Sequence, residues 1–318
     1  MKDKINILVV QIGKIGDMIL TTPLLGCLKR IFPESELSVL ASPNNSTVAK
    51  NLVCVDRTHV YDKKALSTAK LLLSLRQKSY DYWIDPKDEY SSTSKILERL
   101  SGPKLSIGFN IKDKVFDINL QNFVRGKHRV DINLASVNYL SEPNEYNTVM
   151  PHVDIPQKDS MIIDGRLEGV KGKFILLNMS AGDRTRYLKP EVWAELAGKI
   201  NSDMNIVLTG LEKDYNNINS VINSVKRSNV FFLKANTIFE FAELIRRCDL
   251  LVTPDTSAIH LASCFNTPVA AMYHNVQWNI IKFGPLSDKY RIIVSKDENS
   301  LESISSGELI TAVNELLS

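Results

Sequence analysis

The first 23 residues contain the feature that most constrains the fold: an apolar run, a glycine-containing turn and an apolar helix. The run, Ile5 and Ile7 to Val10, predicts a buried strand of a parallel sheet, because strands covered on both faces are continuously apolar. Gly13 and Gly16 predict a tight turn, and a helix is expected from near Met18. In an open α/β sheet such turns lie where ligands bind, outside the carboxyl ends of the strands.

Asp17 stands where this turn becomes the helix. One interpretation is a helix N-cap, since Asp is favoured at that position. The other is a carboxylate that meets the ligand, and the stretch alone leaves both open. The glycine spacing is not Gly-x-Gly-x-x-Gly, so it does not support a dinucleotide-binding fingerprint.

Composition indicates a globular protein long enough for two domains, with 318 residues, 44% hydrophobic and 24% charged. No apolar run approaches the roughly 20 residues that a membrane span needs. The N-terminus lacks a signal-peptide pattern, so we expect a cytoplasmic protein. The four cysteines are far apart with no Cys-x-x-Cys, which predicts free thiols and no zinc site.

The net charge of +3 is unevenly placed. Residues 1–156 hold 21 Lys and Arg against 17 Asp and Glu, whereas the remainder holds 18 against 19. This excess is too small to predict nucleic-acid binding. It suits an anionic acceptor or an anionic membrane surface, with the basic segment from Lys112 to Arg129 as the docking candidate. Scattered solubilising lysines explain the charge equally well.

Predicted strands and helices alternate along the chain, which indicates an α/β fold with two Rossmann-like doubly wound domains facing a central cleft. We expect domains at 1–156 and 157–318, with a linker from Ser141 to Pro156 where Pro and Asn are dense. The expected strands are 36–41, 58–61, 82–84, 105–109, 174–179, 205–209, 230–233, 250–252 and 269–273. The expected helices are 65–78, 91–100, 131–140, 190 onward, 213–225, 238–247, 258–264 and 308–317.

The clearest signal of the second half runs from Asp255 to His260, a strand end followed by a polar turn and a helix start. Thr256 and Ser257 bring hydroxyl and N–H groups to one helix N-terminus, which suits a phosphate or diphosphate. His260, three residues after Ser257, is expected on the same helix face. The alternative is Asp255 or Ser257 as a cap and His260 as a histidine at the edge of the core.

Two other loops of the second half carry candidate groups. Arg184 and Arg186 are candidates for neutralising a leaving diphosphate, or are exposed loop charges. Glu212 follows a strand end, where an acid can accept hydrogen bonds from a ribose. Its alternative role is to favour the helix dipole from the first turn.

Together these motifs resemble the lipopolysaccharide heptosyltransferases, inverting glycosyltransferases of GT-B architecture. The resemblance rests on Ile15-Gly-Asp-Met followed by Thr22-Pro, and on Asp255-Thr with His260-Leu-Ala and Thr267-Pro, and it covers nearly the whole chain. It implies an ADP-heptose donor held by the C-terminal domain. It also implies a lipopolysaccharide or lipooligosaccharide core acceptor, such as Kdo-lipid A, held by the N-terminal domain at the inner face of the cytoplasmic membrane, with no metal or cofactor.

The resemblance assigns roles to individual residues. Asp17 becomes the general base that takes the acceptor hydroxyl proton, and a carboxylate is competent for that step. Lys14, Gly16 and His128 are expected on the acceptor side. The donor-side residues implied are Arg186, Glu212, Asp255, Thr256, Ser257 and His260.

Three positions depart from the family pattern, and all lie in the donor half. Ser257 replaces a common Gly, Leu188-Lys replaces Trp-Pro, and His274-Asn replaces Gly-Pro. The alternatives are therefore a related transferase with another nucleotide sugar, or a nucleotide-sugar-binding protein with little turnover. Asp17 argues against the latter, because binding alone needs no base in the other domain.

Overall fold

The computed structural model describes residues 4–141, 150–200 and 203–318, and the chain forms two compact units. The first unit ends at Asp154 and the second begins at Ile155. The sequence-based boundary lies two residues later. Most of the predicted linker, residues 142–149, lies outside the described residues.

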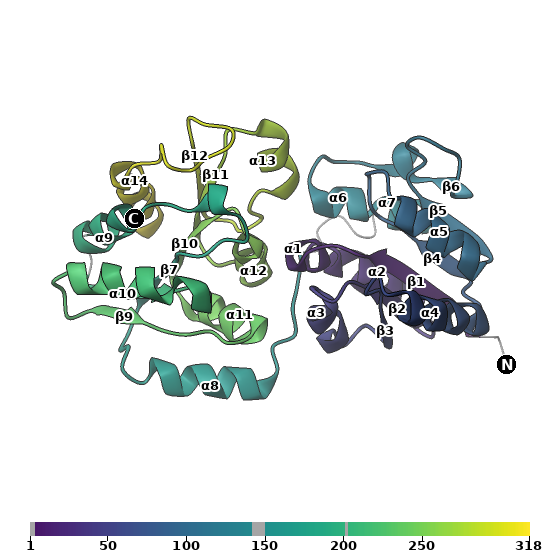
Figure 1. Cartoon of the computed structure of the whole chain (residues 1–318), viewed down its shortest axis with the longest axis horizontal. Helices are drawn as coiled ribbons and strands as arrows, with labels where there is room; N and C mark the ends of the chain where they lie inside the picture. The colour runs from purple at the N-terminus through teal and green to yellow at the C-terminus, as the bar shows by residue number, and fades with distance from the viewer. Residues whose placement is uncertain (1–3, 142–149, 201–202) are drawn as a thin grey trace. The chain divides into compact units, whose positions relative to one another are not determined.

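The first unit is built on a six-stranded parallel sheet in the order β3-β2-β1-β4-β5-β6 (Figure 1). The chain fills one half of the sheet from β1 and then returns to β4, so β1 and β4 are the neighbours at which the winding direction changes. Ligands of doubly wound sheets bind at this switch point. The strands are β1 (Asn6–Gln11), β2 (Glu36–Ala41), β3 (Arg57–Val60), β4 (Tyr82–Ile84), β5 (Leu105–Gly108) and β6 (Ile118–Asn119).

Helices cover both faces of this sheet. On one face, Leu71 and Leu75 of α4 and Leu97 of α5 pack into the same core cluster as Leu8 and Trp83 of the strands. The helix α2 packs with α6 and α7 in a separate group. The helices are α1 (Ile15–Ile19), α2 (Thr22–Ile31), α3 (Ser46–Asn51), α4 (Ala65–Lys78), α5 (Ser92–Ser101), α6 (Arg129–Asn133) and α7 (Ala135–Leu140), with the 3-10 turn η1 (Leu120–Phe123).

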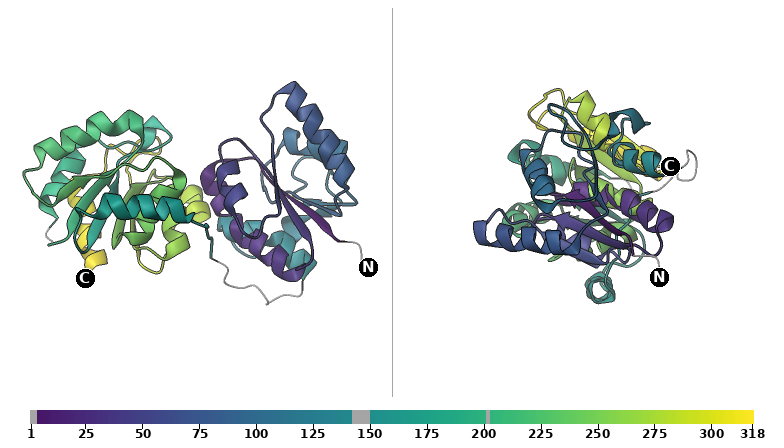
Figure 2. Two further views of the ribbon diagram at one scale, coloured as in Figure 1. Left: turned by 90° about the horizontal axis from the view of Figure 1, so that it is seen from below. Right: turned by 90° about the vertical axis from the view of Figure 1, so that its right-hand side faces the viewer.

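The second unit repeats this arrangement in the order β12-β11-β10-β7-β8-β9, so its switch point lies between β7 and β10. Its strands are β7 (Phe174–Asn178), β8 (Asn205–Thr209), β9 (Val230–Phe232), β10 (Leu250–Pro254), β11 (Val269–Tyr273) and β12 (Tyr290–Val294). Its helical segments are α8 (Gln157–Leu167), α9 (Pro190–Lys199), α10 (Tyr215–Ser224), α11 (Ile238–Arg247), α12 (Ser257–Phe265), α13 (Gln277–Phe283) and α14 (Ser306–Leu317), with the 3-10 turns η2 (Arg184–Arg186) and η3 (Glu212–Asp214). Figure 2 shows the second unit from two further sides, coloured from teal through green to yellow.

The expected first helix is wrong in its start and in its continuity. It begins at Ile15 rather than near Met18, and it ends at Ile19 before α2 starts at Thr22. Pro23 has no N–H for the Ile19 carbonyl, so the helix cannot continue through it. The Thr22 hydroxyl donates to that carbonyl instead, at 2.7 Å.

Other elements also differ from the predicted ones. The predicted helix over 131–140 divides into α6 and α7 at Leu134. Sequence patterns did not predict α3, α8, α13, β6 or β12. Four of these five are short, and α8 has exposed apolar residues, Met161 and Ile162, that break its periodicity.

The core contact of α5 gives a stability prediction. Leu97 is 2% exposed, whereas its neighbour Ile96 is 57% exposed. We expect Leu97→Ala to lower the free energy of unfolding by about 2–5 kcal/mol, because it removes buried methyl groups and leaves a cavity. Ile96→Ala is the matched control and should change it by less than about 0.5 kcal/mol. Urea denaturation measures both values, and equal losses would contradict the packing described for α5.

Candidate active site

Asp17 lies in the first turn of α1, at the carboxyl edge of the first sheet, and its side chain is half-buried. Its Oδ2 accepts a hydrogen bond from the backbone N–H of Lys14 at 2.9 Å. Lys14, not Asp17, is the N-cap residue, so the N-cap interpretation of Asp17 is wrong. The carboxylate instead folds back over the turn from the third helical position.

Gly13 makes room for this carboxylate. A Cβ added at Gly13 would lie 2.7 Å from Asp17 Oδ2 and 2.9 Å from Gln11 Oε1. Both distances are shorter than ordinary Cβ contacts, so a side chain at Gly13 would displace the Asp17 carboxylate and the Gln11 amide from these positions. The glycine predicted from the motif therefore has a direct steric reason.

A buried Asn from the next loop holds the turn from behind. Asn45 is fully buried, and its Nδ2 donates to the carbonyl of Gln11 at 2.8 Å. Its Oδ1 accepts from the backbone N–H of Ser42 at 2.9 Å. The Ser42 hydroxyl then donates to the Gly13 carbonyl at 2.7 Å, which ties the loop after β2 to the turn after β1.

A second polar group fixes the far end of α1. The Gln11 side chain donates to Thr21 Oγ1 at 2.7 Å, and that hydroxyl donates to the Asp17 carbonyl at 2.7 Å. Asn133, on α6 and fully buried, donates to the Leu20 carbonyl at 2.8 Å. Sequence patterns did not point to Asn45 or Asn133, whose side-chain N–H groups donate to acceptors 31 to 113 positions away in the chain.

A pocket of about 140 Å³ opens at the switch point between β1 and β4. Asp85, which follows β4, is buried in its wall and accepts hydrogen bonds from the Ser94 hydroxyl and the Lys87 backbone N–H. Burial raises the pKa of the Asp85 carboxyl above its usual range, although those two donors oppose the shift. The lining residues are Val10, Gln11, Ile12, Tyr61, Lys63, Asp85, Lys87, Ser91, Thr93 and Ser94.

The four site residues predicted for the first unit do not all lie together. Lys14, Gly16 and Asp17 share the turn after β1, but none of these three is among the described residues that line the pocket. His128 lies on another element, where its Nδ1 accepts from the Val130 backbone N–H at 3.2 Å and caps α6. The structure therefore gives His128 a structural role at the start of α6.

In the second unit the structure joins two of the predicted residues. Arg186 Nη1 donates to the Asp255 carbonyl at 2.5 Å and lies 3.3 Å from Asp255 Oδ2. The same carboxylate accepts from Asn279 Nδ2, on α13, at 2.9 Å. Asp255 is buried while the Arg186 side chain is 31% exposed, so the acid positions the guanidinium at the β7–β10 switch point.

The helix α12 starts beside this pair. Thr256 is its N-cap, and the hydroxyl accepts from the Ala258 backbone N–H at 3.3 Å. Asp255 and Ser257, the caps considered from the sequence, do not have this role. His260 is 5% exposed and its ring centroid lies 6.4 Å from that of Phe283, so it is a buried histidine one turn behind Ser257.

Glu212 is exposed and begins the 3-10 turn η3 after β8. The buried acid of this loop is Asp214, which the sequence analysis did not select. Its Oδ2 accepts from the Ser180 hydroxyl at 2.5 Å and from the Tyr187 hydroxyl at 2.9 Å. The Ser180 Oγ also accepts from the Leu211 backbone N–H at 2.7 Å, so the loops after β7 and β8 are joined directly beneath Glu212.

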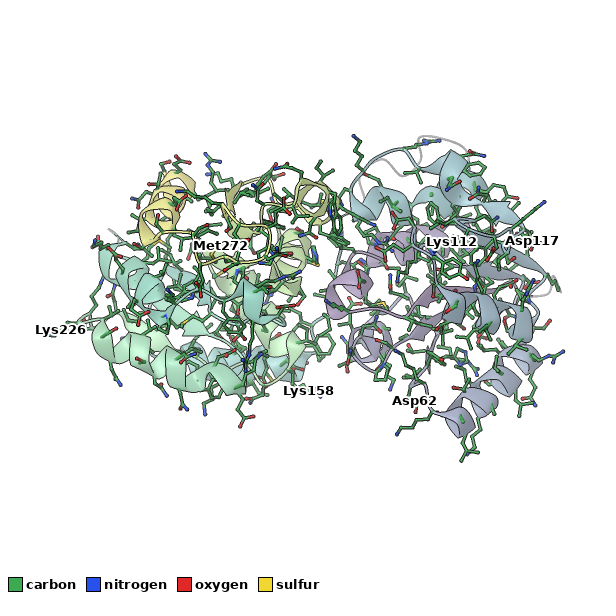
Figure 3. The ribbon with its side chains drawn as sticks, turned by 45° about the horizontal axis from the view of Figure 1, so that its top comes forward. Asp62, Lys112, Asp117, Lys158, Lys226 and Met272 are labelled. Carbon is green, nitrogen blue, oxygen red and sulfur yellow. The ribbon has the colours of Figure 1, made fainter. Side chains whose placement is uncertain are left out.

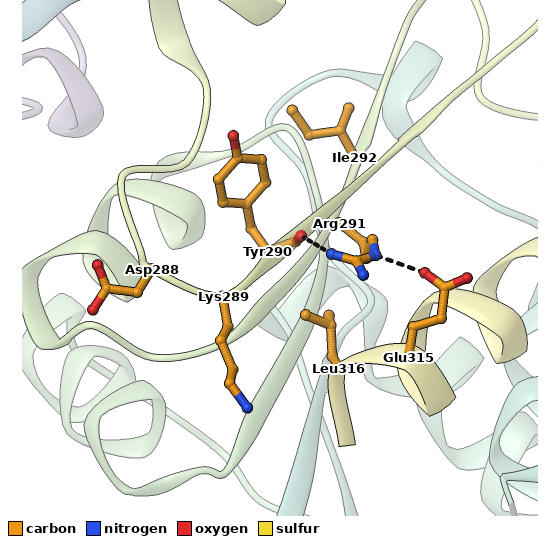
Figure 4. A pocket seen from close by; sticks show the side chains of 7 residues that line it. All are labelled: Asp288, Lys289, Tyr290, Arg291, Ile292, Glu315 and Leu316. Carbon is orange, nitrogen blue, oxygen red and sulfur yellow. Dashed lines mark hydrogen bonds and ion pairs between the residues drawn. The ribbon is translucent and has the colours of Figure 1, made fainter. Parts of the chain in front are cut away.

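A larger depression of about 500 Å³ lies elsewhere in the second unit (Figure 4). It is at the amino end of β12, where Arg291 Nε pairs with Glu315 Oε2 at 2.6 Å. None of the predicted site residues lines it. Its place at the amino end of an edge strand is also opposite to the edge where doubly wound sheets bind ligands.

Within the described residues, no three or more His, Cys, Asp or Glu side chains are grouped so as to hold a metal ion. The expectation of transfer without a metal stays a prediction.

Comparisons with known proteins agree with this architecture. Residues 68–310 match the model of glycosyltransferase family 9 (heptosyltransferase). The chain is 22% identical to lipopolysaccharide heptosyltransferase 3 of Escherichia coli, over 95% of this chain and 96% of that protein.

Two solved structures have a similar fold. One is the glycosyl transferase family 9 protein from Veillonella parvula, with a TM-score of 0.85, 18% identity, and coverage of 100% of this chain and 98% of that chain. The other is the Escherichia coli ADP-heptose lps heptosyltransferase II, with a TM-score of 0.77, 20% identity, and 98% coverage of both chains. These similarities confirm the predicted α/β fold class with its two doubly wound sheets.

The buried Asn45 gives a prediction for the turn that carries Asp17. We expect Asn45→Ala to lower the free energy of unfolding by about 1–3 kcal/mol, because it leaves buried backbone groups of Gln11 and Ser42 unpaired. The matched control is Asn122→Ala, at an exposed position of the same unit, with a change below about 0.5 kcal/mol. Denaturant titration compares the two, and a loss at Asn45 no larger than at Asn122 would contradict the proposed support.

Proposed function

This chain belongs to glycosyltransferase family 9, the heptosyltransferase family, and from that premise we propose the reaction and the residues that perform it. The proposed reaction moves a heptose from ADP-heptose to a lipopolysaccharide or lipooligosaccharide core acceptor with inversion at the anomeric carbon. The observation that carries the proposal is the family match over residues 68–310. Asp17 lies outside that range, so its role is argued from its own geometry.

Asp17 is proposed as the general base. The Lys14 backbone N–H donates to Asp17 Oδ2. Because no hydrogen bond from the described residues reaches Asp17 Oδ1, that oxygen is available to the acceptor hydroxyl. In the step, Asp17 takes the hydroxyl proton while the hydroxyl oxygen forms a bond to the anomeric carbon. The bond from that carbon to the diphosphate oxygen breaks on the opposite side, and ADP leaves with the electron pair.

The acceptor is proposed to bind at the carboxyl edge of the first sheet. The turn of Lys14 and Gly16 presents Asp17 there, and Lys63 in the wall of the β1–β4 pocket offers positive charge for an anionic sugar. His128 is proposed to hold the start of α6 on the acceptor side, through the hydrogen bond that its Nδ1 accepts from the Val130 backbone N–H.

The leaving diphosphate is proposed to bind where Arg186 meets the N-terminus of α12. Arg186 supplies a charged donor, and Thr256 and Ser257 stand at the positive end of a nine-residue helix. Asp255 acts by orienting Arg186 rather than by touching phosphate, since two anions repel. His260 supports the first turn of α12 from within, and the exposed Glu212 is proposed to accept from the ribose hydroxyls.

The departures from the family pattern have local explanations. Leu188 is buried in the core of the second unit. His274 Nε2 is 2.9 Å from the Thr185 carbonyl, so this histidine helps to hold the turn that carries Arg186. Ser257 is half-buried at the first position of α12, where the family commonly has glycine. Its side chain beside the proposed diphosphate site favours the second candidate function, a transferase of the same mechanism that uses another nucleotide sugar.

An anionic glycolipid acceptor also implies contact with the membrane surface, and we propose peripheral association with the inner face of the cytoplasmic membrane; nucleic acid is not a proposed partner. Among the described helices, none is long and apolar enough to cross a bilayer. Within the basic segment predicted as the docking surface, Lys114 is exposed, as is Lys112, which is labelled in Figure 3. Arg129 is 4% exposed and pairs with Asp88, so its expected contribution to that surface is wrong.

The Asp17→Asn variant tests the assigned base. The amide keeps the shape and can still accept from the Lys14 N–H, but it cannot take a proton. We expect kcat to fall by about 10²–10⁴-fold while the Kd for ADP-heptose stays within about twofold. Steady-state transfer assays and calorimetric titration of the donor measure the two quantities. Equal loss of both, or of neither, would refute the role.

The Arg186→Ala variant tests the diphosphate site. Loss of a charge-assisted hydrogen bond to phosphate should weaken donor binding on the order of ten- to hundredfold. Arg184→Ala is the matched control, because Arg184 is exposed in the same turn, and its loss is expected to change the Kd by only about twofold. Calorimetric titration with ADP compares the two variants, and an unchanged Kd for Arg186→Ala would remove Arg186 from the site.

A further inference from the structure

Four of the exposed large apolar side chains of the first unit lie on two neighbouring helices. On α4, Leu66 is 81% exposed and Leu73 is 61% exposed. On α5, Ile96 is 57% exposed and Leu100 is 47% exposed. Single exposed apolar residues need no explanation, but four on two helices that contact each other do, and these four are here named the apolar patch.

The exposed stripe of each helix differs from the stripe that it buries against the sheet. The opposite stripes of the two helices, with Leu71 and Leu75 on α4 and Leu97 on α5, are buried together on one face of the sheet. Leu66 and Leu73 are seven residues apart, and Ile96 and Leu100 are four apart, so each pair forms one stripe along its helix. The two stripes therefore lie on the outer surface of one helical layer.

Basic residues are interspersed with this apolar patch. Lys70 and Arg76 on α4 and Arg99 on α5 are exposed, and the exposed Lys63 and Lys64 directly precede α4. The sequence of α4 has no acidic residue, and the one acid of α5, Glu98, is 8% exposed. Lys78 is the basic residue of α4 that is already paired, with Glu36 at 2.6 Å.

The nearby acids are already bonded within the protein. Asp113 pairs with Lys95 at 2.8 Å, and Asp62 accepts from the Ser67 hydroxyl and the Lys64 N–H. Tyr90 lies next to α5, with Lys95 Nζ at 4.2 Å and Lys112 Nζ at 5.1 Å from its ring centroid. Apolar stripes, exposed cations and a flanking tyrosine are the chemistry of a surface that rests on an anionic bilayer.

The amino ends of the same helices border the pocket at the β1–β4 switch point. Tyr61 and Lys63, just before α4, line it from one side. Ser91, Thr93 and Ser94, at the start of α5, line it from the other. We propose that this α4–α5 face, defined by Leu66, Lys70, Leu73, Arg76, Ile96, Arg99 and Leu100, docks the enzyme on the anionic membrane leaflet and thereby brings the glycolipid head group to the pocket.

This inference rests on the proposed function, because it assumes a lipid-anchored acceptor. The first experiment therefore needs no substrate. Full-length protein is sedimented with vesicles of phosphatidylcholine, with or without phosphatidylglycerol. We expect binding only to the vesicles that contain phosphatidylglycerol, and weaker binding as salt rises. No binding to either vesicle type would overturn the proposal.

Two double variants separate the apolar and basic contributions. Leu66→Ser with Leu73→Ser, and Lys70→Gln with Arg76→Gln, should each reduce the vesicle partition coefficient by on the order of tenfold or more. The basic variant should also flatten the salt dependence. Because all four side chains are exposed, melting temperatures should stay close to the parent value and show that the variants fold.

Matched controls come from the second unit. Met161→Ser with Ile162→Ser changes two exposed apolar residues of α8, and Lys158→Gln with Lys226→Gln removes two exposed lysines (Figure 3). Both should leave the partition coefficient within about twofold, and an equal loss in the controls would contradict docking through α4 and α5. Light scattering tests whether this face is instead an interface between two copies of the chain. A parent dimer that dissociates in the Leu66→Ser, Leu73→Ser variant would contradict membrane docking and show such an interface.

A lipid-free core oligosaccharide distinguishes failure of this inference from failure of the proposed function. The docking variants should transfer heptose to that soluble acceptor at the parent rate but lose activity on vesicle-bound glycolipid. Full activity of the docking variants on vesicles would overturn the docking role alone. If the parent protein transfers nothing to either acceptor yet binds vesicles as expected, the proposed function fails and the docking surface stands.

Discussion

The parallel order of each sheet is the constraint on which the rest of the structure depends. In both units the chain fills one half of the sheet and then returns to the centre, so the loops after β1 and β4, and after β7 and β10, diverge at the carboxyl edge. Asp17 follows β1 and Arg186 follows β7, which gives them corresponding places in the two units. In the proposed mechanism, Asp17 accepts the proton of the acceptor hydroxyl and Arg186 binds the leaving diphosphate.

These two groups are held by buried polar residues rather than by the strands themselves. Asn45 fixes the turn that carries Asp17, and Asp255 fixes Arg186 while also binding Asn279. Asp214 joins the loops around Glu212. A buried polar group that loses its hydrogen-bond partner destabilises the folded state, so each of these contacts restricts its loop to one arrangement. Such preorganisation is what electrostatic stabilisation of a leaving group requires.

Sequence patterns predicted the features that depend on neighbouring residues. The apolar runs predicted the central strands, and the glycine turn and the polar turn after β10 located Asp17 and Thr256. The patterns failed where distant residues decide the outcome: the acceptors of the Asn45 and Asn133 side-chain N–H groups, and the donors to Asp214, come from distant parts of the chain. Arg129 looked like a surface charge because nothing in the sequence places Asp88 beside it. Pro23 in the sequence is a signal for the end of α1, but the sequence does not show that the Thr22 hydroxyl bonds the Ile19 carbonyl there.

The most direct test of the central claim is to determine the product formed from ADP-heptose and a heptose-deficient core glycolipid. Mass spectrometry identifies the added sugar, and NMR of its anomeric proton gives the configuration of the new bond. The account predicts one added heptose whose anomeric configuration is opposite to that in the donor. Retention of the donor configuration would contradict the single displacement assisted by Asp17. Release of ADP and free heptose without transfer would contradict the assignment of the acceptor.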